Sequence, residues 1–213
     1  MFVPGPLTAG AREMYCRNVY LRTGLTMPAE GWVIDLGANA GLFTLLAATE
    51  GARVVAVEAQ HGFTRETARL LDVNNIEQTR VHIETALAAA GPHVALVGTL
   101  ADDNRWRAAS HAAAERPGQV SVPELMRRYG IDRVGLLKMD IEGGEFTVLH
   151  HGSDLSWLAR VDQIAMEVHP QYGDVSSLLD VLHQHGFAVH ITDNVGRIVP
   201  EDSIQASYLY CRR

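Results

Sequence analysis

Short apolar runs alternate with longer amphipathic stretches along most of the chain, a pattern typical of buried strands and surface helices. Strands are predicted at residues 32–35, 53–57, 80–84, 134–139, 161–168, 187–192 and 206–211. Helices are predicted at residues 8–23, 39–49, 62–74, 121–130, 144–150 and 174–186. This order indicates an α/β fold with a seven-stranded, mostly parallel sheet. The last two predicted strands have no helix between them, which suits an antiparallel terminal strand.

Two segments depart from the alternation. Residues 1–30 are predicted to form a helical N-terminal cover, either a lid over a ligand or a helix packed on the sheet edge. Residues 86–118 are predicted to be an insertion near the substrate side, or else only a mobile connection, and they include an extra apolar run at residues 93–97. Aromatic and arginine side chains in these segments are candidate contacts for an acceptor molecule: Tyr15, Tyr20, Arg105 and Trp106.

Composition restricts the class of protein and its partners. With 213 residues, 47% hydrophobic and 20% charged, the chain is predicted to form one soluble domain over residues 1–213. A formal charge of −7 argues against a nucleic-acid partner. The N-terminus lacks the features of a signal peptide and no apolar stretch has membrane-spanning length, so no membrane partner is expected. Cys16 and Cys211 form no metal or redox motif and fit a reducing cytoplasm. The expected partner is a small-molecule acceptor. A homodimer is also compatible with the sequence.

The turn after the first strand has the pattern of a nucleoside site. It reads Asp35-x-Gly37-x-Asn39-x-Gly41. Its glycines allow a ligand to approach the backbone, and the following helix start should offer free N–H groups. Glu58 ends the second strand, where a carboxylate can accept the hydroxyls of a ribose.

The same turn indicates which nucleoside it binds. A dinucleotide site would need the third glycine of G-x-G-x-x-G to hold a pyrophosphate. Asp35 would repel a pyrophosphate but suits the ammonium of an amino acid. The pattern therefore favours S-adenosyl-L-methionine as the cofactor. An NAD(P)-dependent oxidoreductase, a turn without any ligand, and a cofactor-binding partner subunit without turnover are the alternatives.

A second cluster of chemical groups follows two later strands. Lys138, Asp140, Glu142 and Glu145 come at the end of one, and Glu167 and His169 at the end of another. The carboxyl ends of parallel strands meet at one edge of a sheet, so these groups are expected to share the cofactor crevice. Helix capping and surface ion pairs are the alternative explanation for Asp140, Glu142 and Glu145.

These motifs together resemble the FkbM family of S-adenosylmethionine-dependent methyltransferases. The resemblance covers residues from about 15 to 186, and its most specific part is the K-x-D-x-E-G-x-E block at 138–145. It implies a class I methyltransferase fold, a Rossmann-like three-layer sandwich, and methyl transfer usually to an oxygen of a sugar or natural product. The cofactor contacts it implies or places nearby are Asp35, Gly37, Ala38, Asn39, Gly41, Glu58, Ala59, Thr85 and Asp140. The family often has an acidic turn after the third strand, which residues 88–91 lack, so the adenine contact is open.

The resemblance also implies an active-site role for Lys138, Asp140, Glu142 and Glu145, with Glu167 and His169 opposite them. Among these the predicted catalytic residues are Lys138, Asp140, Glu167 and His169. An alcohol acceptor must lose its proton, and a neutral imidazole with its ordinary pKa of ~6.5 suits that task. His169 is therefore the predicted general base, with Asp140 or Glu167 orienting it or the substrate. The alternative is Mg²⁺ or Mn²⁺ held by Asp140, Glu142, Glu167 and His169, which would lower the pKa of the hydroxyl instead.

Overall fold

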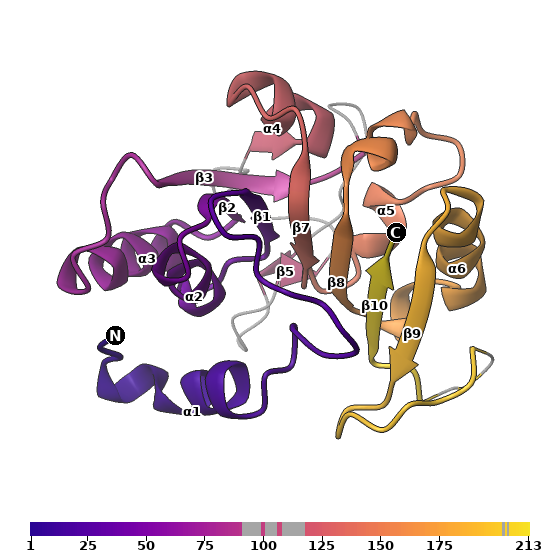
Figure 1. Ribbon diagram of the computed structural model, residues 1–213, viewed down its shortest axis with the longest axis horizontal. Coiled ribbons are helices and arrows are strands. Elements are labelled where there is room, and N and C mark those ends of the chain that lie inside the picture. The colour runs from indigo at the N-terminus through magenta and orange to yellow at the C-terminus, as the bar shows by residue number, and fades with distance from the viewer. Residues whose placement is uncertain (91–98, 101–105, 108–117, 202, 204) are drawn as a thin grey trace.

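The computed structural model describes residues 1–90, 99–100, 106–107, 118–201, 203 and 205–213. Their centre is an eight-stranded sheet in the order β6-β3-β2-β1-β7-β8-β10-β9 (Figure 1). All neighbouring pairs from β6 to β8 are parallel, and β10 runs antiparallel to both of its neighbours. The strands are β1 (Trp32–Leu36), β2 (Arg53–Glu58), β3 (Val81–Ala88), β6 (Gly118–Val120), β7 (Val134–Met139), β8 (Gln163–Glu167), β9 (Ala188–Thr192) and β10 (Tyr208–Arg212).

Helices cover both faces of this sheet. The α-helices are α1 (Thr8–Ala11), α2 (Leu42–Thr49), α3 (His61–Val73), α4 (Val122–Arg128), α5 (Glu145–Val148) and α6 (Val175–Gln184). Short 3₁₀ turns are η1 (Gly5–Leu7), η3 (Ser156–Arg160) and η4 (Pro170–Tyr172), and η2 (Arg12–Cys16) is a π-helical turn. No helix of the described residues has the length and apolar character needed to cross a bilayer.

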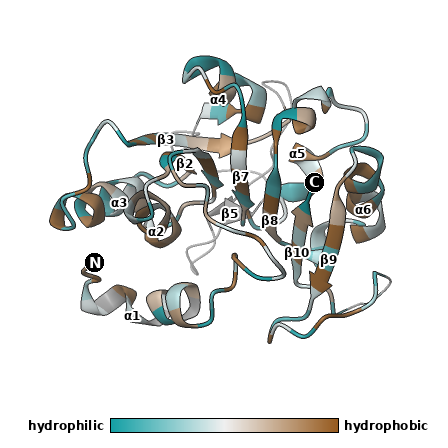
Figure 2. Ribbon diagram, in the orientation of Figure 1, coloured by the Kyte–Doolittle hydropathy of each residue, from teal (hydrophilic) through white to brown (hydrophobic). Residues whose placement is uncertain are grey.

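Two hydrophobic cores form because neighbouring strand residues face opposite sides of the sheet. Val33, Val54 and Leu136 pack with α2, α3 and the N-terminal segment. Ile34, Val55 and Leu137, each one residue further on, pack with α4, α5, η3 and α6. Along α3 and α6, hydrophobic and polar residues alternate as an amphipathic helix requires (Figure 2). The result is the predicted three-layer sandwich.

The sheet order creates a crevice between β1 and β7. The chain runs outward from β1 through β2 to β3 on one side, and from β7 to β8 on the other. The helix that follows β1, α2, packs on one face, whereas α5, which follows β7, packs on the opposite face. Helices that diverge in this way leave the carboxyl ends of the two strands open, which is where open α/β sheets bind ligands.

The seven predicted strands are all present, and the structure adds an eighth, the short β6 at the sheet edge. The prediction of one helix over 8–23 is wrong, because regular helix ends at Ala11, the π-turn ends at Cys16, and Asn18 and Thr23 adopt positive φ. In the 86–118 segment, β3 continues to Ala88, and β4 (Thr99–Leu100) pairs with β5 (Trp106–Arg107). The strand expected at residues 93–97 and the candidate contact Arg105 lie outside the described residues.

Candidate active site

The glycine-rich turn is shaped mainly by contacts within the protein. Gly37 has φ +77°, and a Cβ there would lie 1.8 Å from the carbonyl oxygen of Asp140. Gly41 has φ +81°, and its Cβ would lie 2.5 Å from Thr67 Cγ2 on α3. We expected a ligand to need these glycines, but the backbone of β7's end and the side chain on α3 are what exclude a Cβ. With Gly41 and Asn39 both left-handed, α2 starts at Leu42 rather than near Asn39.

The N–H groups of the turn already have partners, contrary to expectation. Those of Gly37 and Ala38 both donate to the carbonyl oxygen of Val57, at 2.9 and 3.0 Å. The N–H of Asn39 donates to Glu58 Oε2 at 3.0 Å, and that of Ala40 to the Asn39 side chain. The N–H of Gly41 donates to the carbonyl of Ala38. A pyrophosphate would therefore find these five donors engaged, unlike those of a dinucleotide loop.

Asp35 lies beneath the turn in a buried ion pair with Lys138. The two residues are partners in the register of β1 and β7, and Lys138 Nζ lies 3.1 Å from Asp35 Oδ1. Thr44 Oγ1 donates to the other carboxylate oxygen at 2.7 Å, and Nζ also donates to the Gly37 carbonyl at 2.7 Å. Burial acts to lower the pKa of Lys138, but Asp35 and Asp140 outweigh it and raise that pKa above its usual value. The charge of Asp35 is thus already balanced within the protein.

A cavity of about 260 Å³ opens above this pair, at the crevice between β1 and β7. On one side it is lined by Gly37, Ala38, Asn39 and Ala40, and at its base by Lys138, Asp140 and Glu167. The remaining walls come from the N-terminal segment, from α2 and from β10: Leu7, Gly10, Met14, Val19, Tyr20, Leu42, Phe43 and Tyr208. Asp35, Gly41, Glu58 and Thr85 do not line it. The carboxylates that reach the cavity are Asp140 and Glu167 rather than Asp35.

Tyr20 closes one wall of the cavity. Its hydroxyl donates to Asp140 Oδ2 at 2.8 Å and lies 3.3 Å from Glu167 Oε2, and its ring lies 5.2 Å from Lys138 Nζ. Burial, together with these two carboxylates, raises the pKa of Tyr20 well above its usual value, so the hydroxyl stays protonated as a donor. Burial and the charge of Asp140 raise the pKa of Glu167 to about 7. The N-terminal cover thus contacts the carboxylates of Asp140 and Glu167 directly.

Glu58 and Thr85 sit at the ends of β2 and β3, next to the turn. Glu58 is 9% exposed and accepts N–H groups from Asn39 and from Gln60, the latter at 2.8 Å. Burial raises the pKa of Glu58 despite these two hydrogen bonds. Thr85 pairs with Glu58 in the sheet register, and its hydroxyl lies 3.3 Å from that of Thr64. Ala59 follows Glu58 directly, so these predicted cofactor residues stay together at one edge of the turn.

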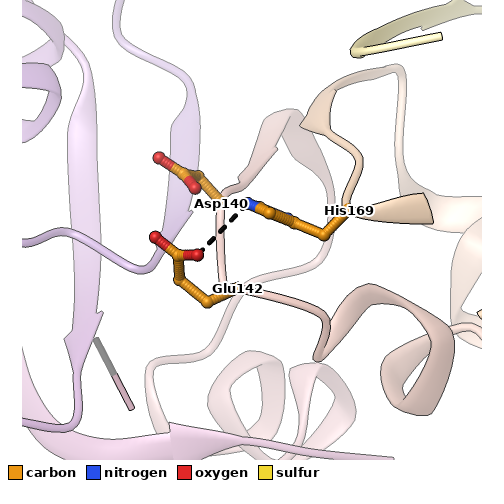
Figure 3. A group of neighbouring side chains, drawn as sticks. All are labelled: Asp140, Glu142 and His169. Carbon is orange, nitrogen blue, oxygen red and sulfur yellow. Dashed lines mark ion pairs between the residues drawn. The ribbon is translucent and has the colours of Figure 1, made fainter. Parts of the chain in front are cut away.

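His169 is held between two glutamates. Its Nε2 lies 3.3 Å from Glu142 Oε2, and its Nδ1 lies 3.3 Å from Glu145 Oε1 (Figure 3 shows the Glu142 side). Glu145 is fully buried at the start of α5 and also accepts the N–H of Ile141 at 3.0 Å. Burial acts to lower the pKa of His169, but Glu145, Asp140 and Glu142 outweigh it and raise that pKa to about 9. The raised pKa favours the protonated ring, whereas a general base must be neutral. The base role of His169 stays a prediction.

Asp140, Glu142 and His169 come together as potential metal ligands. One ligand atom from each lies within 4.8 Å of the others. Figure 3 shows the ring nitrogen of His169 directed toward the two carboxylates. Glu167, the fourth predicted ligand, is not in this group, and its carboxylate lies 3.3 Å from the Tyr20 hydroxyl that also donates to Asp140. The structure brings three of the four predicted ligands together within the described parts of the chain, and metal binding by this set stays a prediction.

Sequence reasoning missed several residues of the cavity. Tyr208 and Phe43 line it, and Thr44 completes the Asp35 pair, although none of them belongs to a motif. Tyr208 lies on β10, far from the turn in sequence, and reaches the cavity because β10 pairs with β8. The large side chains of residues 14–21 were the available signal for the N-terminal wall.

Two known proteins have similar sequences. The antimetabolite synthetase AmbE of Pseudomonas aeruginosa is 30% identical over 84% of this chain, which spans only 10% of that relative's length. The 31-O-demethyl-FK506 methyltransferase FkbM of Streptomyces tacrolimicus is 28% identical, with 84% of this chain and 80% of the relative covered.

Solved structures share the fold. The methyltransferase FkbM of Methylobacillus flagellatus superposes with a TM-score of 0.55 at 14% identity, covering 92% of this chain and 47% of that one. A Streptococcus mutans protein solved in complex with SAH gives a TM-score of 0.51 at 11% identity, covering 99% of both chains. Residues 35–189 match the methyltransferase FkbM domain, which is most of the chain. The chain belongs to the FkbM methyltransferase domain family.

Proposed function

We propose that this chain uses S-adenosylmethionine to methylate a hydroxyl oxygen of a small molecule, either a sugar or a secondary metabolite. The observation that carries the proposal is one cavity bounded by the glycine-rich turn and by Asp140 and Glu167 at the ends of β7 and β8. Family membership supports methyl transfer. The Streptomyces relative is named a 31-O-demethyl-FK506 methyltransferase, and this name supports oxygen as the methylated atom.

The residues around the turn fit an adenosyl cofactor with a cationic amino-acid end. Asp140 and Glu167 reach the cavity as carboxylates that can accept an ammonium, a role for which the sequence had suggested Asp35. Glu58 keeps lone pairs beyond those used by Asn39 and Gln60, and these can accept ribose hydroxyls. The bound SAH of the structurally similar Streptococcus mutans protein supports this choice of cofactor. The engaged N–H groups of residues 37–41 disfavour a dinucleotide.

When bound, S-adenosylmethionine supplies a methyl group on a positively charged sulfur. The chain's own tasks are to align the acceptor and to exclude water, and alignment alone can lower a barrier by ~7–11 kcal/mol. Tyr20, Met14 and Leu7 provide the cover that excludes water from the cavity. The groups at the ends of β7 and β8 provide the acceptor for the hydroxyl proton. His169, when neutral, would accept this proton directly. If the carboxylates held Mg²⁺, the cation would lower the pKa of the hydroxyl and the released proton would pass to water.

Titration calorimetry of the purified chain tests the cofactor. We expect micromolar binding of S-adenosylmethionine and S-adenosylhomocysteine and none of NAD. Glu58→Gln should weaken both adenosyl ligands by about tenfold, because a neutral amide accepts ribose hydroxyls less strongly than a carboxylate. Glu77→Gln, an exposed control in the turn after α3, should bind like the unaltered chain. Binding of NAD alone would favour an oxidoreductase. If none of the three ligands bound, the result would favour a partner subunit without turnover.

A methyl-transfer assay tests the class of acceptor. It measures the release of S-adenosylhomocysteine with a panel of sugars and hydroxylated metabolites. Turnover with a hydroxyl compound supports the proposal. Turnover only with amines or thiols would show that nitrogen or sulfur, and not oxygen, is the methylated atom. The assignment of the cofactor would be unaffected.

A further inference from the structure

We propose that Asp140, Glu142 and His169 form a binding site for one divalent cation that prefers oxygen ligands, Mg²⁺ or Mn²⁺, with Glu145 holding the His169 ring in position. The site adjoins the cofactor cavity through Asp140, which belongs to both. Its use in activating an acceptor hydroxyl rests on the proposed function. The binding of the cation itself does not.

The spacing of the three side chains fits a single coordination sphere. Ligands at right angles on a cation, each about 2.1–2.3 Å away, are about 3.0–3.3 Å from each other. His169 Nε2 and Glu142 Oε2 are 3.3 Å apart, and the ligand atoms of all three residues lie within 4.8 Å of one another. Figure 3 shows the imidazole of His169 facing the carboxylates of Asp140 and Glu142, with the ion pair to Glu142 dashed. A cation between these groups could contact all three after small side-chain adjustments.

Glu145 provides an independent reason to expect a ligand here. Metal-binding histidines usually direct their second ring nitrogen to a carboxylate, which fixes the ring and its tautomer. His169 Nδ1 lies 3.3 Å from Glu145 Oε1, on the side of the ring away from Glu142. Glu145 is fully buried, and its Oε2 has no hydrogen-bond partner among the described residues. Glu145 accepts the N–H of Ile141 and also faces His169, and a carboxylate in that second position is the usual partner of a metal-bound imidazole.

Among the described residues, the other contacts of Asp140 use only one of its two carboxylate oxygens. Tyr20 donates to Asp140 Oδ2, which orients that carboxylate and still leaves Oδ1 for a cation. The Lys138 ammonium is in direct contact with Asp35 and with the Gly37 carbonyl, so its closest partners lie outside the proposed cation site. Two carboxylates and one imidazole with room for water form a ligand set that suits Mg²⁺ or Mn²⁺ better than a closed structural zinc site.

The test is a titration of the full chain with Mn²⁺ alone, followed by electron paramagnetic resonance and by calorimetry. We expect one Mn²⁺ per chain. Asp140→Asn, Glu142→Gln and His169→Asn should each weaken Mn²⁺ binding by at least tenfold, and Glu77→Gln should not change it. Glu142 is partly exposed, so Glu142→Gln keeps the fold, as thermal unfolding will verify. Absence of binding to the unaltered chain, or unchanged binding in Glu142→Gln, overturns the proposal.

Glu145 is a positioning residue in this proposal and has its own readout. Glu145→Gln should weaken Mn²⁺ about tenfold while S-adenosylhomocysteine binding, measured without metal, stays as in the unaltered chain. If both affinities fall together, the role of Glu145 is structural and the orienting role is rejected. S-Adenosylhomocysteine binding without Mn²⁺ binding rejects the metal site alone, and Mn²⁺ binding without S-adenosylhomocysteine binding rejects the proposed function alone.

Discussion

At the scale of single residues, the Asp35–Lys138 pair explains why two charged side chains lie in the centre of the sheet. Both are almost completely buried, and each is the other's register partner across β1 and β7. A buried charge is costly when unpaired, whereas a pair with further hydrogen bonds is tolerated. Thr44 and the Gly37 carbonyl supply those hydrogen bonds. The pair therefore anchors the glycine-rich turn to β7 beneath the cavity.

Lys138→Met tests this anchor. Removal of the ammonium leaves Asp35 buried without a counter-charge, so we expect the free energy of unfolding to fall by about 3–5 kcal/mol. Urea denaturation measures it. The double variant Asp35→Asn with Lys138→Met should be more stable than Lys138→Met alone, because no charge is left buried. If Lys138→Met unfolds within about 1 kcal/mol of the unaltered chain, the pair does not stabilise the fold as argued.

At the scale of elements, the N-terminal segment is a cover held by a few polar contacts. Tyr15 donates to the Leu42 carbonyl at 2.8 Å, Tyr210 donates to the Val19 carbonyl at 2.6 Å, and Tyr20 donates to Asp140. Its regular helix is only four residues long, and a π-helical turn follows it. Short irregular elements open more readily than core strands, because few cooperative hydrogen bonds resist the opening. The segment is thus suited to admit and then enclose a cofactor.

Hydrogen exchange with mass spectrometry tests the cover. Saturating S-adenosylhomocysteine should slow amide exchange in residues 7–20 by about fivefold or more, because the ligand fills the cavity that these residues line. Helix α6 packs on the opposite face of the sheet and serves as the internal control, where only the smaller slowing due to stabilisation of the whole fold is expected. Equal slowing in both segments would indicate global stabilisation rather than closure of the cover.

At the scale of the whole molecule, the sheet order decides where the chemistry lies. The turn after β1 and the acidic ends of β7 and β8 are about 100 residues or more apart in the chain. They meet because β1 and β7 are neighbours and their helices pack on opposite faces. A ligand bound in this crevice contacts both halves of the sheet. It should therefore stabilise the entire fold and not only one element.

Thermal unfolding with added ligand measures that coupling. A ligand at 100 times its dissociation constant stabilises the folded state by about 2.7 kcal/mol. For a chain of 213 residues this corresponds to a rise in melting temperature of roughly 5–10 °C. We expect this rise with S-adenosylmethionine and with S-adenosylhomocysteine, and no shift with NAD at the same concentration. A shift with NAD alone would contradict the cofactor assignment.

The sequence by itself determined the elements and the motifs. Apolar runs and amphipathic spacing are local properties, so seven strands, five of the six predicted helices and the family resemblance could be read directly. The N-terminal helix was predicted too long because positive φ at Asn18 and Thr23 depends on packing against the rest of the protein. The short β6 escaped prediction because a three-residue edge strand has no periodicity to detect.

The tertiary structure alone decided which groups face which partner. The sequence placed Asp35 and Lys138 in different motifs, and only the register of β1 with β7 pairs them and turns Asp35 away from a ligand role. The same holds for Glu145, whose helix start points it at His169, and for Glu167, which shares the Tyr20 hydroxyl with Asp140. Charge pairing depends on distances of a few ångströms between distant segments, and only the packed fold sets such distances.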